Sequence, residues 1–176
     1  LTAAVNRVVG DNHRIRFAAD IATSAATAFA ESFGDITEHW FNSVHMQSHI
    51  DGMVALGAVD LLTAGFPCPP LSSASRVQIT NVETRWPKIH KLLALIFTAL
   101  EYAERTRPRG VILETVGHLT DESDLNMRYV LLWWEQLLNL RLPGYKWSFI
   151  RSNPLHIGSR GKRTRTWITG VRVDAA

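Results

Sequence analysis

The chain has 176 residues, which is enough for one compact domain with a real core and short for two. Hydrophobic residues make up 46% and charged residues 20%, so disordered and collagen-like classes are excluded. No apolar run reaches the roughly 18 residues of a membrane helix, and no signal-peptide pattern is present. The lone cysteine, Cys68, excludes an internal disulfide and a Cys-rich zinc site. We therefore expect an intracellular, cytoplasmic protein with no membrane partner and no metal.

The charge is distributed unevenly along the chain. From Arg141 onward there are eight Lys and Arg and one acidic residue, a net charge of +7. Residues 1–140 carry eleven bases and fifteen acids, a net charge of −4. A basic end on an acidic body favours contact with a polyanion such as nucleic acid. A solvated basic tail is the alternative.

Strand-like and helix-like segments alternate, which is typical of an α/β fold with a parallel sheet. In chain order we expect a helix over 1–9, a strand over 14–20, a helix over 24–33, a strand over 59–66, a helix beginning near Pro87, a strand over 110–114, a helix over 124–140, and strands over 147–150 and 166–171. Residues 35–57 give no clear pattern beyond a strand near Val44. We treat residues 1–176 as a single domain.

Helical spacing predicts which side chains of the two long helices are buried. The helix that begins near Pro87 places apolar side chains on one face, namely Ile89, Leu92, Leu93, Ile96, Leu100 and Ala103. In the later helix, Leu131, Leu132 and Leu138 are expected to be partly buried. The pair Trp133 and Trp134 is expected to serve core and interface packing.

Three chemically capable side chains fall at or just after the ends of predicted strands. These are Asp20, Cys68 and Glu114. In an open parallel sheet the carboxyl ends of the strands line one crevice, which is where ligands bind. We therefore expect the three side chains to converge there.

Cys68 lies between Pro67 and Pro69 and is followed by Pro70. Flanking prolines fix the backbone and remove amide donors, so the thiol is held on a stiff turn. A thiol acts as a nucleophile when nearby positive charge lowers its pKa. The alternative is a small buried hydrophobic residue.

The charged candidates have roles of their own. Glu114 ends an apolar strand, and partial burial raises a carboxyl pKa and favours a proton donor. Arg163 and Arg165 are two residues apart before a strand, so both point to one side and suit phosphate or base-edge contacts. Asp20 at a strand end suits a ribose hydroxyl. Each has an alternative interpretation. Glu114 could be a carboxylate that caps the next turn, the two arginines could belong to an exposed basic hairpin, and Asp20 could be an ordinary surface aspartate.

The segment around the cysteine carries a recognisable motif. Residues 60–72 read DLLTAGFPCPPLS, which closely resembles the DLL-x-GGFPCQ-x-FS pattern of the DNA cytosine-5 methyltransferases. Residues 114–116 (ETV) resemble the Glu-Asn-Val motif of that family. Residues 153–170 resemble the family segment that contains the pattern PQ-x-R-x-R. Arg163 and Arg165 align with the two arginines of that pattern. The motifs follow the family order along essentially the whole chain.

The chain also departs from the family pattern. Pro69, Leu71, Thr115 and Gly161 stand where the family has Gln, Phe, Asn and Gln. Thr115 and Gly161 remove amide side chains that would brace the pocket. The Gly-rich loop, the target-recognition region and the last two family motifs are not found, so we expect a chain incomplete at both ends, with an apolar flank of the sheet exposed where a first strand would lie. Such a chain should bind the methyl donor weakly and methylate DNA undetectably unless those segments are supplied in cis or by a complementing chain.

The resemblance implies a Rossmann-like, S-adenosylmethionine-dependent methyltransferase fold, a mostly parallel sheet with helices on both faces. It implies attack of Cys68 on C6 of a cytosine flipped out of double-stranded DNA, with Glu114 at N3. Arg165 would contact the base carbonyl, and Arg163 would support the loop or a phosphate. S-Adenosylmethionine would be bound by Asp20, at the ribose, and by Pro67.

Three alternative hypotheses for the function of the chain remain. One is a catalytically inactive relic that still binds DNA, and another is one half of a split methyltransferase. The third is an unrelated cysteine-nucleophile enzyme such as an acyl transferase, which no supporting histidine motif favours. Covalent trapping on 5-fluorocytosine DNA separates the methyltransferase chemistry from the inactive relic and from the acyl transferase.

Overall fold

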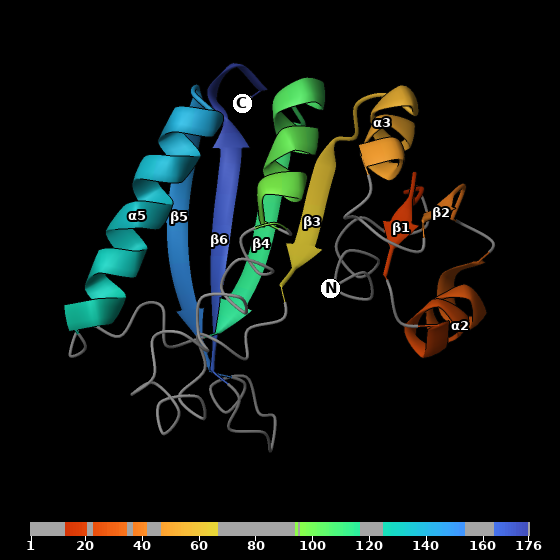
Figure 1. The fold of residues 1–176 in the computed structure, drawn as a ribbon, viewed down its shortest axis with the longest axis horizontal. Coiled ribbons are helices and arrows are strands. Elements are labelled where there is room, and N and C mark those ends of the chain that lie inside the picture. The colour runs from red at the N-terminus through yellow and green to blue at the C-terminus, as the bar shows by residue number, and fades with distance from the viewer. Residues whose placement is uncertain are drawn as a thin grey trace. The chain divides into compact units, whose positions relative to one another are not determined.

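The computed structural model describes residues 13–20, 23–34, 37–41, 47–66, 94, 96–116, 125–153 and 164–175 (Figure 1). The chain divides into two compact units, Leu1–Val59 and Asp60–Ala176. The described part has no helix long and apolar enough to cross a membrane. That the whole chain forms a single domain stays a prediction.

The first unit contains a short parallel sheet and two helices. Its elements are β1 (Ala18–Ala19), α2 (Thr23–Phe33), β2 (Trp40–Phe41) and α3 (Gln47–Ala55). The predicted strand over 14–20 is shorter than expected, because only two residues of β1 pair with β2, with a further isolated bridge between Ile15 and Thr37. The predicted helix over 24–33 is confirmed as α2.

The helix α3 was not predicted from the sequence. Gly52 lies within it, and glycine is unfavourable in a helix interior. Here it has a packing reason, since a Cβ at Gly52 would lie 3.1 Å from the ring of Phe41. The strand expected near Val44 lies outside the described residues, and the observed strand β2 precedes it.

The second unit is built on a four-stranded mixed sheet in the order β3-β4-β6-β5 (Figure 1). The strands are β3 (Leu61–Gly65), β4 (Gly110–Val116), β5 (Tyr145–Ser152) and β6 (Arg165–Arg172), and a short helix η7 (Val173–Ala175) follows. The pair β3–β4 is parallel, while β4–β6 and β5–β6 are antiparallel. All four strands were predicted. β5 and β6 form an antiparallel pair, and β6 lies next to β4 and runs in the opposite direction to it.

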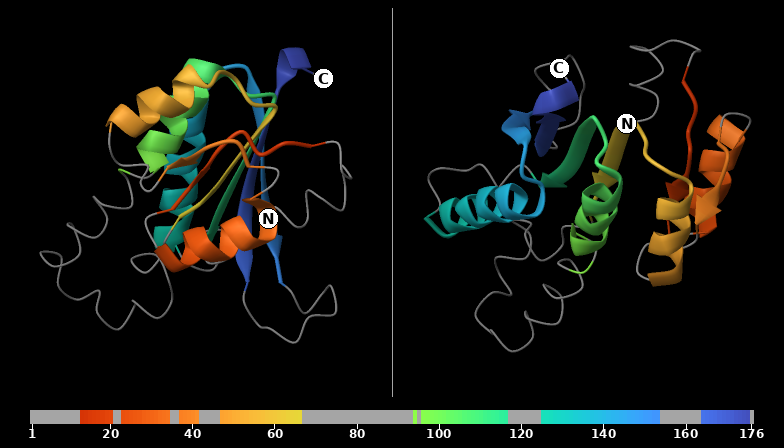
Figure 2. Two further views of the ribbon diagram at one scale, coloured as in Figure 1. Left: turned by 90° about the vertical axis from the view of Figure 1, so that its right-hand side faces the viewer. Right: turned by 90° about the horizontal axis from the view of Figure 1, so that it is seen from above.

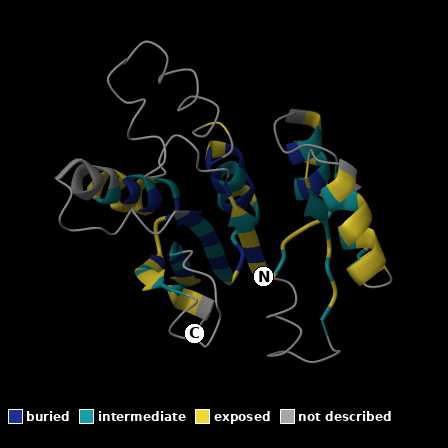
Figure 3. Cartoon of the chain, turned by 90° about the horizontal axis from the view of Figure 1, so that it is seen from below, coloured by how far each residue is buried: buried dark blue, intermediate teal, exposed yellow. Residues whose placement is uncertain are grey.

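Two helices cover one face of this sheet. One is described at residue 94 and over 96–106, and the other is α5 (Leu125–Arg141); both lie on the same side of the strands in Figure 2. The core they enclose includes Leu62, Phe66, Ile96, Leu100, Ala103, Val111, Leu113, Trp134, Leu138 and Ile168. Figure 3 shows buried residues along the strands of this sheet and on the helices beside them.

Among the described residues the predicted burial pattern is confirmed with one exception, while Ile89, Leu92 and Leu93 lie outside the described residues. Ile96, Leu100 and Leu138 are at most 2% exposed, whereas Leu132 is 48% exposed and was wrongly expected to be partly buried. Leu132 lies on the solvent side of α5, because Trp134 and Leu138, four residues apart, define the face against the sheet. The neighbouring Trp133 is 38% exposed.

Two polar contacts hold the ends of these helices. Arg141 Nη2 donates to Glu104 Oε2 at 2.5 Å, and this bonding raises the pKa of the Arg141 guanidinium. The Tyr145 hydroxyl donates to the Pro108 carbonyl, and burial raises the pKa of that hydroxyl. These contacts join the two helices and tie β5 to the start of β4.

Replacing Gly170 by alanine should destabilise the second unit. A Cβ at Gly170 would lie within 2.7 Å of three atoms of the Trp147 indole ring, on the paired position of β5. Moving a packed ring costs about 1–3 kcal/mol. Urea unfolding should show a lower midpoint for Gly170→Ala.

Two controls isolate this clash. Gly34→Ala, which places its methyl group in open space, should leave the midpoint nearly unchanged. In a Trp147→Leu background, the added cost of Gly170→Ala should largely disappear, because the two positions are coupled. An equal cost in both backgrounds would rule out the indole as the cause.

Candidate active site

The carboxylate of Glu114 is the centre of the candidate site. Glu114 was expected at the end of its strand, but β4 continues to Val116. The reason is the ladder with β6, in which Glu114 pairs with Trp167 and Val116 pairs with Arg165. Glu114 is therefore held inside a paired strand, which fixes its backbone more firmly than a strand end would.

Arg165 forms an ion pair with Glu114 across the β4–β6 ladder, through Arg165 Nε and Glu114 Oε1. The side chains are 19% and 27% exposed, so the pair is partly shielded from water. The expectation that burial raises the pKa of the Glu114 carboxyl stays a prediction. Both residues were predicted as site residues, and the structure brings them together.

The last residues of β3 lie on the other side of Glu114. Gly65 pairs with Glu114 in the parallel ladder, and a Cβ at Gly65 would lie 3.4 Å from Glu114 Oε2. The next residue, Phe66, donates its backbone N–H to the Glu114 carbonyl at 3.3 Å. The predicted residues Pro67 and Cys68, which follow, lie outside the described residues, as does Arg163.

Trp167 is a neighbour of the ion pair that the sequence analysis did not identify. It stands directly opposite Glu114 on β6, so both side chains lie on one face of the sheet. Its indole Nε1 donates to Ser152 Oγ on β5 at 2.7 Å. The signal was available in the sequence, because Trp167 is two residues after Arg165 in a predicted strand and so shares its face.

Thr115 does not share the face of Glu114. It is 2% exposed and pairs with Thr166, which is fully buried, on the face covered by the helices. The side chain at position 115 therefore points away from the face of Glu114, and the expectation that an amide there would brace the pocket stays a prediction. Successive residues of a strand point to opposite faces, which is the physical reason.

Asp20 belongs to the first unit, where it directly follows β1. Its side chain is exposed, and its backbone N–H donates to the Phe41 carbonyl at 3.2 Å. An exposed carboxylate just after a parallel strand fits a ribose hydroxyl. Among the described residues, no group of three His, Cys, Asp or Glu side chains could hold a metal ion.

Comparison with known proteins identifies the family. Residues 4–176 match the family model of the C-5 cytosine-specific DNA methylases. The chain belongs to this family. Over 116 residues it is 29% identical to the type II methyltransferase M.BsuFI of Bacillus subtilis, covering 65% of this chain and 25% of that protein.

Solved structures support the methyltransferase fold. The chain matches S. pombe Dnmt2 methyltransferase with a TM-score of 0.62 at 13% identity, over 98% of this chain and 45% of that one. It matches a prophage-encoded DNA modification methyltransferase of E. coli with a TM-score of 0.61 at 20% identity, over 93% of this chain and 41% of that one. The fold class expected from the sequence is thus confirmed, in a chain that spans less than half the length of these relatives.

Proposed function

We propose that this chain carries the catalytic centre of a DNA cytosine-5 methyltransferase that uses S-adenosylmethionine. Cys68 is the nucleophile, Glu114 acts at N3 of the base, and Arg165 orients Glu114 and contacts the base carbonyl. Arg163 supports the adjoining loop or a phosphate. Asp20 and Pro67 contact the cofactor, and double-stranded DNA is the substrate.

The observation that carries this proposal is the ion pair of Glu114 and Arg165 beside the end of β3. The backbone bond from Phe66 to Glu114 fixes the point from which the chain proceeds to Cys68. Cys68 follows Phe66 by two residues in the sequence. A site that combines its thiol with this carboxylate and guanidinium would match the needs of addition to a cytosine ring.

In the proposed reaction each site residue has one role in the transfer of a methyl group to cytosine. The Cys68 thiolate adds to C6, while Glu114 provides a hydrogen bond or proton at N3, which makes C5 nucleophilic. Bound S-adenosylmethionine would supply the methyl group. Loss of the C5 proton and departure of the Cys68 thiolate then restore the aromatic ring. Arg165 holds the Glu114 carboxylate in place throughout.

Covalent trapping tests this proposal. The chain is incubated with saturating S-adenosylmethionine and a duplex in which 5-fluorocytosine is mispaired. The mispair lowers the cost of extruding the base from the duplex. The fluorine at C5 blocks release, so a single addition event is recorded even without turnover. We expect a denaturant-resistant protein–DNA complex that disappears when the methyl donor is omitted. A complex that forms without the donor would contradict the proposed function, and so would the absence of a complex when a second chain supplies the Gly-rich loop and the target-recognition region.

A further inference from the structure

We propose that Arg151 binds a DNA backbone phosphate at the end of the sheet that carries the site of Glu114 and Arg165. This inference rests on the proposed function, since it names a contact for the DNA substrate. It assigns a phosphate contact to a residue outside the family motifs. Arg165 stays paired with Glu114 and does not bind a phosphate.

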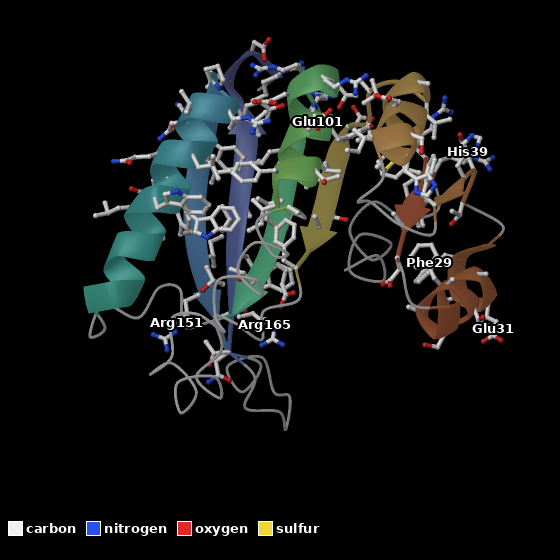
Figure 4. The ribbon with its side chains drawn as sticks, viewed as in Figure 1. Phe29, Glu31, His39, Glu101, Arg151 and Arg165 are labelled. Carbon is white, nitrogen blue, oxygen red and sulfur yellow. The ribbon has the colours of Figure 1, made fainter. Side chains whose placement is uncertain are left out.

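Arg151 is placed at the same end of the sheet as the candidate site. It is the second-last residue of β5 and pairs with Thr166, so it follows the face of Thr166, opposite to that of Arg165 and Glu114. The next residue, Ser152, pairs with Arg165, so Arg151 and the site share the end of the sheet and not a face. Val116, the last residue of β4, also pairs with Arg165. Figure 4 shows the labelled side chains of Arg151 and Arg165 at this end of the strands.

The two arginines differ in what they already contact. Arg165 is engaged with Glu114, and its Nη1 donates to the Thr164 carbonyl at 3.0 Å. Arg151 is exposed, and its side chain makes no hydrogen bond or ion pair within the part of the chain that the structure describes. Its charge is therefore available to a partner, whereas Arg165 would have to leave a carboxylate to bind a phosphate.

The sequence between the two arginines is basic. The sequence from Arg151 to Arg165 contains five Lys and Arg and no acidic residue. At the other end of the same strands, Arg172 Nε is 2.6 Å from Asp174 Oδ1, and Arg109 Nη1 is 4.0 Å from Asp60 Oδ1. Those arginines are partly neutralised, so an anionic strand is drawn to the end that carries the candidate site.

The salt dependence of DNA binding tests the assignment. Affinity for a duplex is measured by fluorescence anisotropy at several salt concentrations, with Cys68→Ala as the background so that no chemistry interferes. Each phosphate contact contributes about 0.9 to the slope of log K against log salt. Arg151→Ala should lower the slope by about that amount, and Arg151→Lys should keep it.

A matched control is Lys146→Ala. Lys146 is an exposed cation on the same strand β5, about 17 Å from Arg151 at the spacing of extended residues. Its removal should leave the slope unchanged, and Arg165→Ala should weaken binding with little change in slope. Circular dichroism checks that each variant keeps its fold.

The outcomes separate this inference from the proposed function. If Arg151→Ala leaves the slope unchanged, or lowers it no more than Lys146→Ala, Arg151 is not a phosphate contact. The absence of DNA binding at low salt would also overturn the inference. Because the measurement does not depend on Cys68, a lower slope for Arg151→Ala together with failed trapping would reject the methylation chemistry alone.

Discussion

Replacing Cys68 by alanine should abolish the covalent complex with 5-fluorocytosine DNA and leave non-covalent binding nearly unchanged. The adduct is a bond between a thiolate sulfur and C6 of the base, and alanine has no group that can form it. The loss should therefore be complete rather than partial. Denaturing gel electrophoresis measures the adduct, and anisotropy measures the binding.

The chain offers clean controls for this experiment. Cys68 is the single cysteine, so no second thiol can substitute for it. Cys68→Ser keeps the shape of the side chain and should also form no adduct, because a hydroxyl is far less nucleophilic than a thiolate. Lys146→Ala, an exposed change on β5, should trap DNA as the unmodified chain does. An adduct that persists in Cys68→Ala would remove Cys68 from the mechanism.

The second unit could be predicted largely from the sequence because its elements are long or strongly apolar. Apolar runs stopped by Pro67 and bounded by Gly110 indicated β3 and β4, and the later hairpin was predicted as two strands. The first unit was harder to predict. Its strands are only two residues long, so they show no alternation of apolar and polar residues. The helix α3 contains Gly52, and its apolar residues show no clear helical spacing.

The identity of the site residues was predictable, but their pairing was not. Glu114 and Arg165 were selected by their positions relative to strands and by resemblance to a motif. Their ion pair depends on the antiparallel register of β4 and β6, which no local pattern specifies. The same register places Trp167 opposite Glu114 and turns Thr115 to the helix-covered face.

Replacing Glu114 by glutamine should slow the formation of the trapped adduct by about 10²–10⁴-fold, the usual contribution of a positioned acid or base. Glutamine keeps the size of the side chain and can still form a hydrogen bond, but it cannot deliver a proton to N3. It also weakens the contact with Arg165, so the guanidinium loses its ionic partner. The rate of adduct formation under saturating methyl donor measures the effect.

Glu104→Gln provides the matched comparison, because Glu104 also pairs with an arginine and is similarly exposed. Glu104 and Arg141 are 29% and 28% exposed, against 27% and 19% for Glu114 and Arg165. The pair with Arg141 joins two helices and bears on stability alone. Both substitutions should therefore lower the free energy of unfolding by up to about 1.5–3 kcal/mol, the worth of a hydrogen bond to a charged group. The slow adduct formation should belong to Glu114→Gln alone, and equal rates for the two variants would mean that Glu114 only stabilises the sheet.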